Sequence, residues 1–186
     1  EDLPEPFSGL RRKEIVNFCR LNKQKNIPLL ISAFEKLLRE HPDYTLRIYG
    51  RGDEKENLMA LTREKGLEAS VIFEDFAPDV HQRIRDAAMY VCSSDFEGLS
   101  NSMLEAMAIG MPCVCTDCAG GGARMMIRHG ENGLLTPVGE EAALYEAMKR
   151  LAEDPELAAR LGREAAKVRR ELSIEQIAGR WEAVIG

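Results

Sequence analysis

The chain has 186 residues, of which 45% are hydrophobic and 30% charged, which suits one ordinary domain and excludes a largely disordered chain. Its 25 Lys and Arg residues against 31 Asp and Glu residues give a net charge of −6, which argues against non-specific nucleic-acid binding but allows a local basic site for a small anion. No apolar run approaches the roughly 18 residues of a membrane helix, and the opening EDLPEPFSG lacks the basic start and apolar stretch of a secretory signal.

The predicted elements begin after residues 1–13, which are expected to be a linker because prolines and the Ser8-Gly9 pair interrupt regular structure. Short apolar runs then alternate with helical patterns. Strands are expected at 14–20, 45–49, 71–73, 89–93, 113–116 and 133–136. Helices are expected at 27–38, 53–66, 79–88 and 100–109, with a short one after the glycine-rich turn 120–122. From residue 140 onward the pattern is helical only.

Three helix starts have recognisable caps. Asp53 and Glu56 have the spacing of a capping box. Asp154-Pro155 combines a good N-cap with proline at the first helical position. Ser173 is expected to cap the last helix, whose Trp181 is expected to anchor it through apolar contact.

Strands that alternate with helices indicate a Rossmann-like α/β fold: a parallel six-stranded sheet with helices on both faces and extra C-terminal helices. In such sheets ligands bind beyond the carboxyl ends of the strands. The turns after Arg20, Tyr49, Phe73, Ser93 and Thr116 are therefore the places to look for chemistry.

The five cysteines are an odd number in a chain large enough to fold without disulfides, which favours free thiols and a reducing compartment. Cys113, Cys115 and Cys118 form a C-x-C-x2-C pattern, but no nearby histidine completes a tetrahedral site. We expect small buried thiols there and no metal.

The first candidate site is the turn RLNKQKN at residues 20–26. It places Arg20 and Lys25 at the carboxyl end of a strand and just before a helix, whose N-terminus adds backbone donors and positive dipole. Together they suit a pyrophosphate, with Arg20 as a fork and Lys25 as a point charge. A solvated basic turn is the alternative.

The second candidate is the segment SSDFEGLSNSMLEAMAIG at residues 93–110. Glu105 lies in an otherwise apolar helix, where a carboxylate needs donors such as the hydroxyls of a ribose. Glu97 precedes that helix at the mouth of the expected cleft, and Ser100, Asn101 and Ser102 can cap the helix and expose N–H groups to a phosphate. The alternative for Glu105 is a solvent-facing position.

These segments, taken in order, resemble the nucleotide-binding C-terminal half of family 4 (group 1) glycosyltransferases of the GT-B fold, of the bacterial polysaccharide and glycan-assembly type. RLNKQK resembles the family's arginine–lysine turn, IYGRGDEKENL its strand, glycine turn and helix, and SSDFEGLSNSMLEAMAIGMPCVCTD its E-x7-E segment with the following strand. GENGLL resembles the late glycine loop and strand. The chain departs from the family pattern at Cys19 and Asn26, where glycine is usual, and at Met125, where glutamate is frequent.

The resemblance implies a role for each matching residue. Arg20 and Lys25 would bind the donor diphosphate, Glu105 the ribose hydroxyls and Glu97 the donor sugar. The remaining implied nucleotide-sugar contacts are Gly98, Leu99, Ser100, Asn101, Gly50, Asp75 and Phe76. The implied reaction is retaining transfer from a UDP-sugar, a substrate and not a cofactor, with no metal.

The resemblance also implies an organisation and a location. Residues 14–172 would form the donor-binding domain, and residues 173–186 a helix that packs toward an N-terminal acceptor-binding domain. That domain, outside this chain, would bind a glycan or lipid-linked acceptor, so the chain alone is expected to bind nucleotide without turnover. The expected location is the cytoplasm, with peripheral attachment of the full-length parent to the inner membrane face left open. A non-catalytic nucleotide-sugar sensor of the same fold is the alternative.

Overall fold

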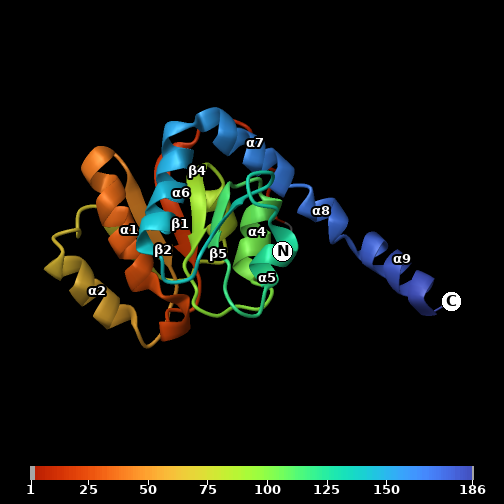
Figure 1. Ribbon diagram of the computed structural model, residues 1–186, viewed down its shortest axis with the longest axis horizontal. Coiled ribbons are helices and arrows are strands. Elements are labelled where there is room, and N and C mark those ends of the chain that lie inside the picture. Colours follow the sequence, from red (N-terminus) through yellow and green to blue (C-terminus); the bar gives the residue numbers. More distant parts are fainter. Residues whose placement is uncertain (1–2, 186) are drawn as a thin grey trace.

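A parallel six-stranded sheet forms the centre of the molecule, as predicted (Figure 1). The computed structural model describes residues 3–185, apart from the side chains at 180 and 183–185. The strands are β1 (Arg12–Phe18), β2 (Thr45–Tyr49), β3 (Val71–Glu74), β4 (Ala87–Cys92), β5 (Cys113–Thr116) and β6 (Leu134–Thr136). Their order is β3-β2-β1-β4-β5-β6, so the order reverses beside β1, where ligands bind in this fold class.

Helices cover both faces of the sheet, and the sheet separates two apolar cores. The helices are α1 (Ile27–Glu40), α2 (Lys55–Glu64), α3 (Val80–Ile84), α4 (Asn101–Ala108), α5 (Gly122–Met126), α6 (Glu141–Glu153), α7 (Pro155–Ala165), α8 (Val168–Glu171) and α9 (Ile174–Ile185), with a 3-10 turn, η1 (Lys23–Lys25), before α1. Leu30 of α1 and Leu144 of α6 pack on one face, and Met103 of α4 on the other. No helix within residues 3–185 combines the length and apolar character needed to cross a bilayer.

The first strand begins and ends two residues earlier than the apolar pattern predicted. Its first residues, Arg12 and Lys13, are exposed, and their side chains pair with Asp86 and Asp43. Because buried residues start only at Glu14, the pattern could not reveal this polar beginning. The early end leaves Cys19 and Arg20 in the turn itself, at the rim of the sheet.

Residues 3–11, expected to be a linker, lie against the domain. The guanidinium of Arg11 donates to the carbonyls of Arg85 and Ala87, at 3.1 and 2.9 Å. Arg169 of α8 donates to the carbonyl of Pro4 at 2.7 Å. Two arginines therefore attach this segment to the sheet and to the C-terminal helices.

The last helix, α9, extends away from the rest of the molecule (Figure 1). The apolar contact expected for Trp181 was wrong: the residue is 62% exposed. Ile174 and Ile177, which precede it at helical spacing, are exposed as well. Because α9 points away from the sheet, this stripe has no apolar cover from the described part of the chain.

Of the two acidic caps predicted, one formed and one did not. The Asp154 carboxylate accepts from the backbone N–H of Leu157 at 2.8 Å and opens α7. The capping box at Asp53 was wrong, because α2 starts later, with Glu54 at the N-cap and no side-chain cap. The backbone of Gly52 packs so closely on the carbonyl of Leu21 that a Cβ there would lie 2.0 Å from the oxygen. This contact fixes the chain just before Asp53, and the helix begins after it.

The two aspartates give a matched pair for unfolding experiments. Asp154→Ala should lower the free energy of unfolding by about 1 kcal/mol, because it removes a capping hydrogen bond. Asp53→Ala should change it by less than about 0.5 kcal/mol, because Asp53 is exposed and caps nothing. Urea unfolding of both variants measures the difference, and equal losses would contradict the assignment of the caps.

Candidate functional site

A cavity of about 480 Å³ lies beyond the carboxyl ends of β1 and β2 and in front of α4. Most residues predicted for the site line it: Arg20, Lys25, Gly50, Phe76, Glu97, Leu99, Ser100, Asn101 and Glu105. Phe18, Cys19, Tyr49, Arg51 and Ser102 complete the lining. Segments separated by about 70 residues thus meet at the switch point of the sheet, as the fold predicts.

Two residues of the predicted set, Asp75 and Gly98, are not among those that line the cavity. The Asp75 carboxylate accepts from Lys55 at 2.7 Å and lies near Arg51 at 3.4 Å, which lowers its pKa. Its side chain is thus engaged at the surface. Gly98 instead packs its backbone against the glycine-rich turn, where a Cβ on Gly122 would lie 1.9 Å from the Gly98 carbonyl oxygen.

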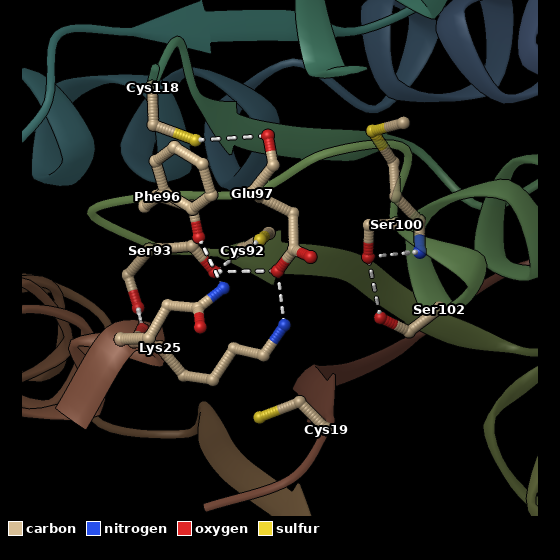
Figure 2. Close-up of polar contacts among 12 residues, drawn as sticks. Cys19, Lys25, Cys92, Ser93, Phe96, Glu97, Ser100, Ser102 and Cys118 are labelled. Carbon is tan, nitrogen blue, oxygen red and sulfur yellow. Dashed lines mark hydrogen bonds and ion pairs between the residues drawn. The ribbon is translucent and has the colours of Figure 1, made fainter. Parts of the chain in front are cut away.

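Lys25 and Glu97 form an ion pair at the centre of the site (Figure 2). Their side chains are only 15% and 19% exposed, so the pair is shielded from bulk water. Burial lowers the pKa of Lys25, but the hydrogen bond and the charge of Glu97 outweigh burial and leave that pKa raised. Lys25 is therefore protonated at physiological pH. The hydroxyl of Ser94 also lies 3.4 Å from Oε2 of Glu97.

Hydrogen bonds from side chains to backbone carbonyls join the two turns that carry this pair. Ser93 donates through its hydroxyl to the carbonyl of Lys25 at 2.9 Å, as Figure 2 shows. Gln24 donates through its side-chain amide to the carbonyl of Phe96 at 2.7 Å. These two hydrogen bonds hold the turn that carries Lys25 against the turn that carries Glu97.

Asn26 explains how the chain accommodates one departure from the family pattern. It has φ 43°, in the left-handed region, which asparagine tolerates better than most residues with a side chain. Its side chain accepts from the N–H of Leu29 at 3.3 Å and donates to Asp95 at 2.7 Å. Asparagine thus keeps the backbone conformation that glycine allows and adds a cap for α1.

Cys19, the second departure, turns its thiol toward Asn17, to whose side-chain oxygen it donates at 3.0 Å. Burial raises the pKa of the Cys19 thiol to about 12, although the charge of Lys25 opposes the shift. The thiol is therefore neutral at physiological pH and adds no negative charge to the cavity. Met125, the third departure, is 75% exposed on α5.

Glu105 lines the cavity, and its side chain is 37% exposed. Its Oε2 lies 3.0 Å from Nε2 of His81, which belongs to α3. The hydroxyl of Ser100 accepts from the N–H of Met103 at 3.4 Å, which confirms the predicted cap of α4. Ser102 continues the polar lining, with its hydroxyl 2.9 Å from that of the buried Tyr90.

The five cysteines are free, and Cys113, Cys115 and Cys118 are buried, which agrees with the thiol interpretation. Within the described residues, one group has metal-binding spacing, Glu40, His41 and Glu153, and it lies apart from the cavity. Lys149 already pairs with Glu40 at 2.5 Å, which opposes a cation there.

The cavity as a whole is suited to a polar ligand that carries phosphate. It combines cations on the first turn, a carboxylate beside them, a second carboxylate on α4 and the N-terminal end of that helix. The model of the family described as glycosyl transferases group 1 matches residues 3–168. The chain belongs to this family.

Relatives of this chain include proteins named as glycosyltransferases. An uncharacterized glycosyltransferase of Haemophilus influenzae is 29% identical over 179 residues, 96% of this chain and 50% of that protein. The N-acetylgalactosamine-N,N'-diacetylbacillosaminyl-diphospho-undecaprenol 4-alpha-N-acetylgalactosaminyltransferase of Campylobacter jejuni is 35% identical over 149 residues, 80% of this chain and 40% of that protein. The chain spans half or less of these relatives.

Solved structures of glycosyltransferases have the same fold. A variant of S. aureus TarM, in complex with fondaparinux, alpha-GlcNAc-glycerol and UDP, superposes with a TM-score of 0.90 at 25% identity, covering 98% of this chain and 37% of that one. Anabaena HepE, in complex with UDP and glucose, gives a TM-score of 0.83 at 25% identity, covering 94% and 48%. The domain is thus a Rossmann-like half of the GT-B type.

Sequence reasoning missed several residues of the site. Phe18 and Tyr49 line the cavity, and His81 contacts Glu105. Phe18 and Tyr49 are the last residues of β1 and β2, so the rule that ligands lie at strand ends could have included them. No local signal marks His81, because its contact is made across two helices.

Two glycines of the group 1 site can be compared directly. Gly122→Ala should destabilise the protein by about 1–3 kcal/mol, because the new Cβ would lie 1.9 Å from the backbone oxygen of Gly98 and force the turns apart. Gly98→Ala adds a Cβ that meets nothing within 4 Å and should change stability by less than about 0.5 kcal/mol. Thermal unfolding of both variants measures this, and similar melting temperatures would disprove the close approach.

Proposed function

We propose that this chain is the donor-binding half of a retaining glycosyltransferase that transfers the sugar of a UDP-sugar to a glycan or lipid-linked acceptor and releases UDP. The observation that carries the proposal is the cavity itself, where Arg20, Lys25, Glu97 and Glu105 meet although they come from two distant segments. A structural or scaffolding role would give no reason for this partly shielded set of charges.

The proposed roles follow from the positions of the charges. Lys25 and Arg20 lie on the first turn, where they can receive the diphosphate, together with the backbone N–H groups at the start of α4. Negative charge grows on the departing diphosphate in the transition state, so cations fixed at this point lower the barrier. Glu105 would accept from the ribose hydroxyls, and Glu97, beside Lys25, would contact the hydroxyls of the donor sugar.

UDP is proposed as the nucleotide because TarM and HepE, at 25% identity, are solved in complexes that contain UDP. The base would lie near Phe76, which is 64% exposed at the mouth of the cavity. The acceptor would bind on a further domain, because this chain matches only half or less of its relatives. A lipid-linked acceptor would place the enzyme at the cytoplasmic face of a membrane, with the exposed stripe of α9 directed toward the other domain.

Calorimetric titration with UDP, GDP and ADP tests the donor site. We expect selective binding of UDP, and Lys25→Ala or Glu105→Ala should raise its Kd by about tenfold or more, as expected for charge-assisted hydrogen bonds. Lys36→Ala is the control, because Lys36 pairs with Glu141 on the surface away from the cavity. Equal binding of all three nucleotides, or equal effects of Lys25→Ala and Lys36→Ala, would refute the proposed site.

A catalytic role is separated from a nucleotide-sugar sensor by Glu97→Gln in a protein that carries both domains. This change keeps the size of the side chain but removes the charge that faces Lys25. In an enzyme it should lower kcat by about 100-fold or more, the scale of losing one preorganised polar group, with a smaller effect on UDP binding. A sensor would show no sugar transfer in either form, measured as UDP release in the presence of acceptor.

A further inference from the structure

His81 occupies a defined position beneath the cavity, between an aromatic ring and a carboxylate. Its ring meets that of Phe18 edge to face, with centroids 5.9 Å apart and planes at 86°. Phe18 in turn packs against Tyr90, with centroids 5.2 Å apart. Because Phe18 and Tyr90 lie on the neighbouring central strands β1 and β4 and are buried, the imidazole packs against the buried centre of the sheet.

The contact with Glu105 restricts one side of that carboxylate. Nε2 of His81 lies 3.0 Å from Oε2 of Glu105. An ionised carboxylate only accepts hydrogen bonds, so the imidazole must donate here and carry a proton on Nε2. Within the part of the chain that the structure describes, Oε1 of Glu105 makes no hydrogen bond, so the acceptor positions on Oε1 and the second lone pair of Oε2 stay available.

A glutamate has three side-chain torsions, and a ligand that binds a glutamate with no other partner must also immobilise that side chain. The side chain of Glu105 is 37% exposed and that of His81 is 20% exposed, so the carboxylate is accessible while its partner is held below it. To accept from both hydroxyls of a vicinal diol, a carboxylate must turn its two oxygens toward them, so the plane of the carboxylate must face the diol. A fixed neighbour on Oε2 sets that plane before the ligand arrives.

We propose that His81 is a positioning residue, which orients the Glu105 carboxylate for the cis-diol of the ribose and thereby adds to the selection of ribonucleotides over deoxynucleotides. This inference rests on the proposed function, in which Glu105 binds the ribose. His81 itself would not touch the nucleotide. It acts through Glu105, so its effect depends on the presence of the two ribose hydroxyls.

The chain offers a matched control at a second histidine. His41 also contacts a glutamate, with Nε2 3.3 Å from Oε1 of Glu153, and packs edge to face on Tyr44 with centroids 6.0 Å apart. Its side chain is 23% exposed, close to the value for His81. His41 does not line the cavity, so His41→Phe removes a comparable contact at a place without a proposed role.

The test compares titrations with UDP and with 2′,3′-dideoxy-UDP. His81→Phe keeps a ring against Phe18 but loses the donor, so the Kd for UDP should rise by about tenfold. The Kd for the dideoxy compound should change by less than about twofold, because that ligand never uses the oriented carboxylate. His81→Gln, which restores an N–H donor at a similar reach, should recover most of the affinity, and His41→Phe should leave both constants unchanged.

Each outcome bears on a separate claim. Combined with Glu105→Ala, His81→Phe should weaken UDP binding no further, because the two residues act through one contact. Equal weakening of UDP and dideoxy-UDP by His81→Phe would overturn the positioning role and indicate a general loss of structure. Normal discrimination in His81→Phe, with discrimination lost in Glu105→Ala, would overturn this inference alone. A wild-type protein that does not prefer UDP to the dideoxy compound would remove the ribose role of Glu105 and the inference with it.

Discussion

The turns at the carboxyl edge of the sheet touch one another through bare backbone, and the arrangement of the site depends on this contact. A Cβ on Gly50 would lie 1.9 Å from the carbonyl oxygen of Cys19, and one on Gly52 would lie 2.0 Å from that of Leu21. The turn after β2 therefore lies directly on the turn after β1. On the other side, Gly122 touches Gly98 in the same way. Glycine is the residue that permits such approach, so these positions bring Lys25, Glu97 and the start of α4 to one cavity.

Pairing of charges is the second constraint on the site. Two carboxylates would repel a phosphate-bearing ligand from the cavity if they stood alone. Glu97 forms an ion pair with Lys25, and Glu105 forms a hydrogen bond with His81. Arg20 and Arg51 also line the cavity, and burial keeps the Cys19 thiol neutral, since its pKa is raised to about 12. The cavity of an acidic protein is thus locally suited to an anion.

Much of the fold could be predicted from the sequence because its signals are local. Apolar periodicity placed β2 and β5 at their observed bounds, and Ser100 and Asp154 cap the helices expected of them. The position of the site followed from the order of strands and helices, since ligands of parallel sheets bind at strand ends. Two distant motifs, around Lys25 and Glu97, were thereby expected in one place, and they meet there.

What could not be predicted depends on contacts between elements. Asp53 has the sequence of a cap, but the approach of Gly52 to Leu21 shifts the helix start and leaves the side chain unused. Trp181 has the large apolar ring of an anchoring residue, but its burial depends on the direction of α9, which points away from the sheet. His81 precedes Glu105 by 24 residues and meets it because α3 and α4 share one face of the sheet.

The two carboxylates of the cavity are bound to partners of different kinds, and this difference fits different tasks. Lys25 is a strong cation whose raised pKa keeps it charged, so Glu97 is held by charge beside the place where negative charge would develop. The imidazole of His81 packs against the buried ring of Phe18. Its hydrogen bond to Glu105 therefore acts more by orienting the carboxylate than by balancing its charge. A charge-balanced glutamate suits the reacting end of a nucleotide sugar, where electrostatics change during transfer. An oriented glutamate suits the ribose end, where hydroxyl geometry stays constant throughout the reaction.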